Sequence, residues 1–205
     1  ALALLSRRQP DDEELAWLAG LREKGVVGLW TADLTDLQEL EGALEQIRSH
    51  QGPLRGVVHC AGLLDDGVLT EQTWERFLPV LAPKLEGAWN LHLTTRQDPL
   101  EAFFLFSSVA ATLGSAGQAN YSAANAFLEA LAEARQAEGL PALAIGWGPW
   151  TVGMGAGLRP EHRERLERQG LGFLPPQEGL GLFQSLLGRG GRVLALRVDF
   201  EALRP

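Results

Sequence analysis

Residues 103–127 decide the fold, and they spell FFLFSSVAATLGSAGQANYSAANAF. The first four are apolar and aromatic, which predicts a strand that breaks off at Ser107 and Ser108. A segment with two glycines follows, and the alanine-rich run that begins at Tyr121 predicts a helix. In open parallel α/β sheets, ligands bind at the carboxyl ends of the strands. A serine at that edge and a tyrosine on the next helix can therefore converge on one point.

Apolar runs of strand length alternate with helical runs on both sides of this stretch. The further strands are expected at Ala1–Leu5, Val26–Trp30, Leu54–Cys60, Ala142–Trp147 and Arg192–Val198. Helices are expected from Pro10 to Gly25 and from Thr35 or Asp36 through Ile47. A longer helix is expected over Glu71–Thr95, with a break or kink near Pro79 and Pro83. Two short helices are expected after a loop at Gly148–Pro160. This alternation predicts an α/β fold with a doubly wound parallel sheet covered on both faces.

Composition limits the class of protein and its partners. The 205 residues are 45% hydrophobic, enough for one core of ordinary size, so we expect one domain over residues 1–205. The formal charge of −8 argues against nucleic acid or an anionic membrane as the main partner. No apolar run is long enough to span a bilayer, and we see no signal peptide. The single cysteine, Cys60, fits a reducing compartment, so a cytoplasmic location is expected.

Tyr121 is the only tyrosine of the chain, and Asn125 follows it by one helical turn. A phenol is a poor acid at neutral pH unless a cation lowers its pKa. Asn125 occupies the position where the helix could have offered a lysine, and Lys84 in the preceding helix is the best candidate for the cation. Taken singly, Tyr121 could be a packed surface aromatic, Lys84 a solvated lysine and Ser108 the end of a strand. Their joint placement at one sheet edge favours a reactive site.

Six segments together resemble the ketoreductase domain of modular polyketide synthases and related fatty-acid synthases, within the short-chain dehydrogenase/reductase superfamily. They are LLSRR (4–8), TADLTD (31–36), VVHCAGLLDDGVL (57–69), LAPKLEGAWNLHLT (81–94), FLFSSVAATLGSAGQANYSAANAFLEALA (104–132) and WGPWTVGMGAG (147–157). Classical members of the superfamily carry lysine four residues after the tyrosine. In the synthase ketoreductases, lysine and asparagine exchange places, as Lys84 and Asn125 do here.

The resemblance implies a Rossmann-type fold and NADPH-dependent reduction of a β-ketoacyl thioester to the 3-hydroxyacyl thioester. Tyr121 would donate a proton to the ketone, and Ser108 would hydrogen-bond the same oxygen. Lys84 would hold the nicotinamide ribose and lower the pKa of the tyrosine, while Asn125 would support a water that relays protons. Such donors stabilise the negative charge that develops on oxygen as hydride arrives.

The resemblance also assigns cofactor residues along the strand ends. Ser6, Arg7 and Arg8 follow the first strand, where the family holds the adenosine 2′-phosphate, so NADPH is favoured over NADH. Two solvated arginines are the plainer explanation of Arg7 and Arg8 alone. The full expected cofactor set is Ser6, Arg7, Arg8, Asp33, Leu34, Ala61, Gly62, Lys84, Tyr121 and Gly148.

Stereochemical control is expected from residues near the tyrosine. Leu64-Asp65-Asp66 resembles the motif of B-type ketoreductases, whose products carry a D-configured (3R) hydroxyl. Leu113 stands where A-type domains carry a tryptophan, and Ala123 stands where epimerising B-type domains carry a proline. The expected substrate and stereocontrol residues are Asp66, Leu64, Leu113, Gln118, Trp147 and Met154, with residues 146–190 as the lid and substrate-side region.

The glycine-rich phosphate loop of the family has no counterpart in this sequence. Ala1–Leu5 matches the second strand of the family fold, so the first strand, the loop and the first helix are not among these residues. We therefore expect the 205-residue chain alone to bind NADPH poorly, to be inactive and to aggregate, because a central strand and the amides that hold the pyrophosphate are missing.

The expected partners follow from the same resemblance. They are a phosphopantetheine-tethered β-ketoacyl substrate on an acyl carrier protein and other synthase domains in the same polypeptide, with no nucleic acid, membrane or metal. Arg159, Arg163, Arg165 and Arg168 could meet an acidic carrier, although the interleaved glutamates favour a solvated helix. Two alternatives stay open: a reductase-like domain kept for architecture or epimerisation without net reduction, and a free-standing dehydrogenase of a small alcohol. The Lys84 and Asn125 exchange argues against the second.

Overall fold

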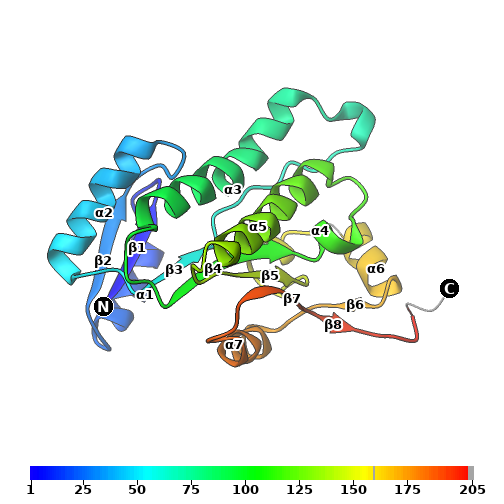
Figure 1. Ribbon diagram of the computed structural model, residues 1–205. Coiled ribbons are helices and arrows are strands. Elements are labelled where there is room, and N and C mark those ends of the chain that lie inside the picture. The colour runs from blue at the N-terminus through cyan, green and yellow to red at the C-terminus, as the bar shows by residue number, and fades with distance from the viewer. Residues whose placement is uncertain (159, 203–205) are drawn as a thin grey trace.

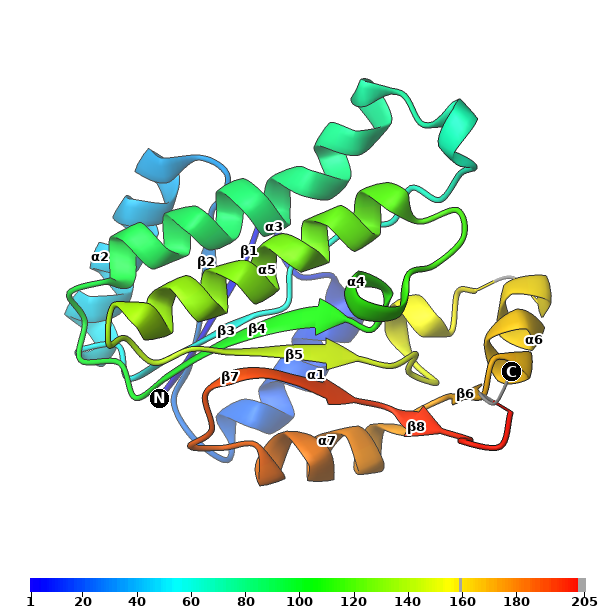
Figure 2. The same cartoon turned by 45° about the vertical axis from the view of Figure 1, so that its right-hand side comes forward.

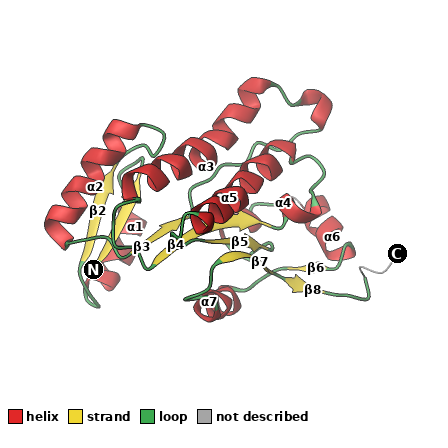
Figure 3. Ribbon diagram, viewed as in Figure 1, coloured by secondary structure: helices red, strands yellow, loops and turns green. Residues whose placement is uncertain are grey.

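The computed structural model describes residues 1–158 and 160–202, in which strands and helices alternate along the chain (Figures 1 and 3). The strands are β1 Leu2–Ser6, β2 Val27–Thr31, β3 Gly56–His59, β4 Ala102–Ser108, β5 Leu143–Trp147, β6 Leu171–Gly172, β7 Gly191–Ala195 and β8 Arg197–Val198. The α-helices are α1 Asp12–Arg22, α2 Leu37–Gln51, α3 Trp74–Thr95, α4 Ala110–Leu113, α5 Ala119–Ala137, α6 Pro160–Arg168 and α7 Pro176–Ser185. Short 3₁₀ turns, η1 Leu69–Glu71 and η2 Gly153–Gly155, precede α3 and α6.

The central sheet has four parallel strands in the order β3-β4-β5-β7. Its register places Ser107 and Ser108 of β4 beside Gly146 and Trp147 of β5. Because the strands are parallel, their carboxyl ends lie along the same edge of the sheet. The predicted α/β fold with a Rossmann-type parallel sheet is confirmed.

Helices cover both faces of this sheet, as Figure 2 shows with α3 and α5 on one side and α7 on the other. Alternation along β4 explains the two cores, because successive side chains of a strand point to opposite faces. Phe103 and Leu105 pack with residues of α2, α3 and α5, whereas Phe104 packs with Phe183 of α7. Both faces of β4 are therefore apolar, which is why its sequence is a continuous apolar run.

Strands β1 and β2 form a separate two-stranded parallel sheet with Leu2 opposite Val27. Within residues 1–158 and 160–202, β1 pairs only with β2 and β3 pairs only with β4. Each of β1 and β3 consequently has one edge whose backbone groups make no ladder hydrogen bonds.

Three expectations for the elements differ from the structure. The expected break in α3 is absent, since the helix continues through Pro79 and Pro83, where packing against α5 outweighs the helix hydrogen bonds that the prolines remove. The expected final strand is two strands: β7 joins the central sheet, and β8 turns away to pair with β6 in the antiparallel direction. The serine strand extends to Ser108, so both serines lie within β4.

Candidate active site

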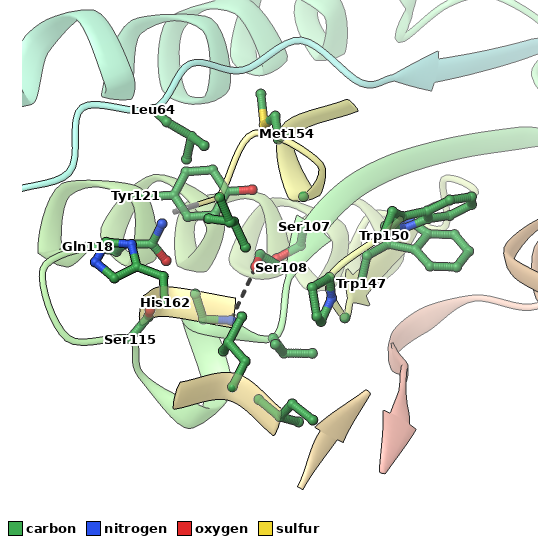
Figure 4. Close-up of a pocket in the computed structure, with 18 of the residues that line it drawn as sticks. Leu64, Ser107, Ser108, Ser115, Gln118, Tyr121, Trp147, Trp150, Met154 and His162 are labelled. Carbon is green, nitrogen blue, oxygen red and sulfur yellow. Dashed lines mark hydrogen bonds between the residues drawn. The ribbon is translucent and has the colours of Figure 1, made fainter. Parts of the chain in front are cut away.

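A cavity of about 360 Å³ lies at the carboxyl ends of β4 and β5 (Figure 4). Eight of the residues singled out from the sequence line it: Leu64, Lys84, Ser108, Gln118, Tyr121, Trp147, Gly148 and Met154. They come from the loop after β3, from α3, from β4, from α5 and the residue before it, from the end of β5 and from the segment after β5. The topology thus brings together the groups that the sequence pattern placed at one sheet edge.

The two serines of β4 point to different surroundings. Ser107 is buried, and its hydroxyl donates to Glu129 Oε1 of α5 at 3.0 Å. Glu129 is also buried and accepts from Arg192 Nη1 of β7 at 3.2 Å, so it ties α5 to two strands. Ser108 lines the cavity, and its Oγ accepts from the Ala110 amide at 3.2 Å. Ser107 also lines the cavity, but its hydroxyl is donated to Glu129, so Ser108 is the better placed of the two serines to act on a ligand.

The start of α5 fixes the backbone of Tyr121. Asn120 is buried, and its Oδ1 accepts from the Tyr121 amide at 2.7 Å. One turn later, Asn125 Nδ2 donates to the Tyr121 carbonyl at 2.8 Å. Asn125 is completely buried and does not line the cavity, and its Oδ1 is a buried atom with no hydrogen-bond partner among the described residues. An acceptor without a partner at this depth is suited to an ordered water.

Lys84 is buried at 3% exposure instead of being solvated, and its Nζ donates to the Phe106 carbonyl at 3.0 Å. Burial lowers the pKa of this ammonium to about 8, and Nζ lies 5.9 Å from the centroid of the Tyr121 ring. A Cβ added at Gly62 would lie 3.0 Å from Lys84 Cε, so the glycine leaves room for the lysine chain. A buried cation at the cavity fits the ribose end of a nicotinamide cofactor.

The pKa of the Tyr121 phenol is raised because burial disfavours the phenolate. Hydrogen bonds from the side chains of Ser108 and Asn125 lower it, but by less than burial raises it. The net direction is opposite to the lowering expected from Lys84. Before a ligand binds, Tyr121 is therefore held as a protonated phenol, which is the form that can donate a proton.

The residues expected to control stereochemistry divide into two groups. Leu64 and Gln118 line the cavity, and Gln118 Nε2 donates to both carboxylate oxygens of Asp66 at 3.1 and 3.2 Å. Asp66 does not line the cavity itself but acts on a residue that does. Leu113, at the end of α4, is 52% exposed and lies outside the lining.

The residues expected at the adenosine end lie apart from this cavity. Ser6 and Arg8 line a second cavity of about 170 Å³ beside β1 and β2, where Arg8 forms an ion pair with Glu14 at 2.6 Å. The Arg7 side chain is 61% exposed and lies 3.9 Å from Asp33.

The remaining cofactor residues make backbone or packing contacts. The Leu34 carbonyl accepts from Asn90 Nδ2 at 2.9 Å. Ala61 and Gly62 belong to the irregular loop after β3 and do not line the larger cavity. Gly148 does line it, and a Cβ there would lie 2.8 Å from Leu196 Cβ, so glycine is required for this close approach.

Helix α6 lies within residues 146–190, the expected lid and substrate-side region, but the α6 residues that line the cavity were not among the expected site residues. His162, Arg165 and Leu166 of α6 line it, and Arg165 Nη2 donates to the Ala116 carbonyl at 3.2 Å. Arg163 is engaged within the fold, because its guanidinium lies 4.3 Å from the Phe173 ring centroid. The alternating charges of α6 are typical of a solvated helix and did not indicate that these side chains line a cavity. Arg159 lies outside the described residues.

Residues 1–158 and 160–202 contain no group of three or more histidine, cysteine, aspartate or glutamate side chains able to hold a metal ion. None of their helices is long and apolar enough to cross a membrane.

Residues 1–152 match the family model described as the KR domain. The chain is 45% identical over 209 residues to the spectinabilin polyketide synthase system protein NorB of Streptomyces orinoci, covering 99% of this chain and 10% of that protein. It is 43% identical over 208 residues to the mycoketide-CoA synthase of Mycobacterium tuberculosis, covering 99% of this chain and 5% of that protein. The chain therefore spans about a tenth or less of the length of these relatives.

Solved structures give the same assignment. A ketoreductase domain from the bacillaene assembly line has a TM-score of 0.90 at 30% identity, covering 98% of this chain and 50% of that one. The ketoreductase PlmKR1 from the first module of phoslactomycin biosynthesis in Streptomyces sp. HK803 has a TM-score of 0.89 at 31% identity, covering 98% and 47%. By its sequence and its fold, this chain belongs to the ketoreductase (KR) domain family of polyketide synthases, within the short-chain dehydrogenase/reductase superfamily.

Proposed function

We propose that this chain reduces a β-ketoacyl thioester, carried by an acyl carrier protein, to the 3-hydroxyacyl thioester with NADPH. The observation that carries the proposal is one cavity lined by Ser108, a protonated Tyr121 and the buried cation of Lys84. Membership of the KR domain family supports the reaction class. A buried ammonium next to an apolar cavity costs stability, and a role in binding a ligand would account for its presence there.

Tyr121 is the proton donor to the ketone. A bound cofactor would supply the hydride, and negative charge would then develop on the ketone oxygen. The Tyr121 hydroxyl gives its proton to that oxygen, and the Ser108 hydroxyl donates a hydrogen bond to it. Donors placed before the reaction stabilise the charge without reorganising. A positioned acid contributes about 10²–10⁴-fold to the rate.

Lys84 and Asn125 support this proton transfer in different ways. The Lys84 ammonium holds the hydroxyls of the nicotinamide ribose, and its charge favours the phenolate that remains after Tyr121 has donated. The buried Oδ1 of Asn125 accepts from a water that returns a proton toward Tyr121.

We assign the preference for NADPH over NADH to the residues that follow the carboxyl end of β1. Arg7 presents an exposed guanidinium after β1, and a planar guanidinium suits a phosphate. Arg8 is bound to Glu14, so it contributes only if that ion pair opens. Arg7 is consequently the main ligand proposed for the 2′-phosphate.

The proposed product carries the D-configured (3R) hydroxyl of B-type domains. Leu64 at the cavity and the contact between Gln118 and Asp66 support it. Solved structures similar to this chain include an A1-type ketoreductase at 35% identity, so fold similarity does not discriminate between A-type and B-type products. Residues 146–190, which supply Trp147, Met154 and Leu166 to the cavity, are proposed as the substrate-side region.

The chain is proposed to work inside a larger cytoplasmic synthase polypeptide, with further domains and a phosphopantetheine-tethered substrate as partners. Its relatives are polyketide synthases of which it spans 10% and 5%.

The test mixes the synthase polypeptide that carries this chain with a β-ketoacyl thioester and either NADPH or NADH, and follows the absorbance of the reduced cofactor. We expect oxidation of NADPH in preference to NADH and a product that is mainly the D-alcohol on a chiral column. No oxidation with either cofactor would refute reduction and favour an architectural or epimerising domain. Mainly L-alcohol would refute the B-type assignment alone.

A further inference from the structure

The irregular loop over residues 60–68, between β3 and η1, forms one wall of the cavity through Leu64. Figure 4 shows Leu64 among the side chains that line the cavity with Tyr121. The loop has no helix or ladder hydrogen bonds of its own. Its shape must therefore be set by side chains that reach it from neighbouring elements.

Arg76 of α3 donates several hydrogen bonds to this loop. Its Nε donates to both carboxylate oxygens of Asp65 at 3.1 and 3.0 Å, and its Nη2 donates to the same carboxylate. Nη2 also donates to the Asp66 carbonyl at 2.8 Å, and Nη1 donates to the Glu71 carbonyl at 3.2 Å. One guanidinium thus fixes a side chain and two backbone carbonyls, which only a planar fork can do.

Gly67 makes room for this guanidinium. A Cβ added at Gly67 would lie 2.6 Å from Arg76 Nη1, so any larger residue would displace the arginine. The Gly67 amide donates to the Gly117 carbonyl at 2.8 Å, just before α5 begins. The loop is therefore attached to α3 on one side and to the approach to α5 on the other.

Hydrogen bonds also connect the 60–68 loop to the backbone of Tyr121. Asn120 Nδ2 donates to the Asp65 carbonyl at 2.9 Å, while its Oδ1 accepts from the Tyr121 amide at 2.7 Å. Asp66, whose carbonyl Arg76 holds, binds Gln118 at the cavity. A contiguous set of hydrogen bonds consequently runs from Arg76 through the loop to Tyr121.

Charge alone does not explain this arrangement. The Arg76 side chain is 30% exposed and that of Asp65 is 40% exposed, and exposed ion pairs contribute little to stability. The guanidinium holds the pKa of the Asp65 carboxyl below its usual range, so the pair stays charged at neutral pH. The contribution of Arg76 is therefore to fix the position of the loop rather than to add stability through its ion pair.

We propose that Arg76 is a positioning residue that fixes the 60–68 loop against the cavity and thereby decides which face of the ketone meets the hydride. The inference rests on the proposed reduction and adds a residue that controls its stereochemistry. Loss of Arg76 frees Leu64 and Asp66 to move, so both orientations of the substrate become accessible.

The test compares Arg76→Gln, Arg76→Lys and the control Arg55→Gln in the synthase polypeptide. Arg55 also forms an exposed ion pair, with Glu101, but at the amino ends of β3 and β4, away from the cavity. Both Arg76 variants should lower the ratio of major to minor alcohol by about tenfold, the scale of losing one good discriminating contact. Lysine should not rescue, because it keeps the charge but not the fork. The control should keep the wild-type ratio.

A wild-type ratio in Arg76→Gln would overturn the inference, even if that variant were slower or less stable. A second readout needs no turnover and so separates this inference from the proposed reduction. Amide hydrogen exchange at Gly67 should accelerate in Arg76→Gln and stay unchanged in Arg55→Gln. Unchanged exchange at Gly67 in Arg76→Gln would also overturn the inference, whether or not the wild type reduces the thioester.

Discussion

Burying the Lys84 ammonium should destabilise the fold at neutral pH, because its pKa of about 8 lies below the ordinary 10.5. Replacing it by the apolar Met should raise the free energy of unfolding, on the scale of about 1–4 kcal/mol seen when buried charges are replaced. The folded state binds fewer protons than the unfolded state between those two values, so wild-type stability rises with pH there. The advantage of Lys84→Met should therefore shrink from about pH 8 upward.

Urea denaturation of the 205-residue chain at low concentration measures this difference, with Lys24→Met as the control because Lys24 is exposed. Lys84→Met should also lose cofactor binding. A variant that is less stable than wild type at pH 7 would contradict the destabilising role assigned to the buried charge.

A second prediction at the scale of residues concerns His59, whose effect on stability falls in the acidic range. Burial, with a smaller contribution from the charge of Lys84, lowers its pKa from 6.5 to about 4. The unfolded chain binds the proton first as pH falls, so stability should decrease between those values, by about 3 kcal/mol at roughly 1.4 kcal/mol per pH unit. Among the residues that the structure describes, none accepts a hydrogen bond from the buried Nε2, so an added proton there would have no partner.

The measurement is the free energy of unfolding from pH 7 to pH 4 in wild type, His59→Gln and the exposed control His50→Gln. His59→Gln should lose less stability across this range than the other two. Equal slopes in all three proteins would show that His59 is not the group that titrates.

At this scale, Tyr121, Ser108 and Lys84 could be predicted because their types and spacing are distinctive. The burial of the Lys84 side chain could not be predicted, and neither could the lack of a hydrogen-bond partner for Asn125 Oδ1 among the described residues. Both depend on how α3 and α5 pack against β4. The upward net shift in the pKa of Tyr121 has the same origin, since desolvation is a property of the packed site.

At the scale of elements, α7 supports the cavity wall through Trp150. A Cβ added at Gly179 of α7 would lie 2.1 Å from Trp150 Cη2, and the Trp150 ring packs edge-on against Trp147 at 5.0 Å between centroids. Gly179→Ala should therefore push Trp150 into the cavity. It should lower the free energy of unfolding by about 1–3 kcal/mol and raise the KM for the thioester.

Gly181→Ala on the same helix is the matched control, because nothing lies within 4 Å of its added Cβ. It should stabilise the helix by about 0.5–1 kcal/mol and leave KM unchanged. Equal effects of the two substitutions in the unfolding and KM assays would mean that α7 does not set the position of Trp150.

Strands and helices with clear periodicity could be predicted from the sequence, whereas elements shaped by distant contacts could not. The apolar run of β4 and the leucine spacing of α2 are local signals. The continuity of α3 through Pro79 and Pro83 depends on its packing, and the split between β7 and β8 depends on pairing with β6. The substrate-side location of residues 146–190 was expected, but the alternating charges of α6 did not indicate which of its side chains line the cavity.

For the whole molecule, the two separate parallel sheets predict self-association of the 205-residue chain. The open edges of β1 and β3 carry unpaired backbone groups beside the exposed Leu2 and Val58. Light scattering should show concentration-dependent association, while the longer synthase polypeptide should not associate through this chain. A 205-residue chain that stays monomeric at high concentration and turns over normally would contradict this prediction.

The parallel order and the position of the site at the carboxyl edge could be predicted, because both follow from strand–helix alternation. The antiparallel pair β6-β8 could not be predicted, since strands of two residues carry no periodic signal.

The most direct test of the central claim compares the wild-type synthase polypeptide with Tyr121→Phe at saturating NADPH. Only the phenolic hydroxyl is removed, so the fold and the cofactor affinity should be kept. We expect the rate of thioester reduction to fall about 10²–10⁴-fold, the contribution of a positioned acid. A Tyr121→Phe protein that binds NADPH as wild type does and reduces the thioester at nearly the wild-type rate would contradict the assignment of Tyr121 as the proton donor.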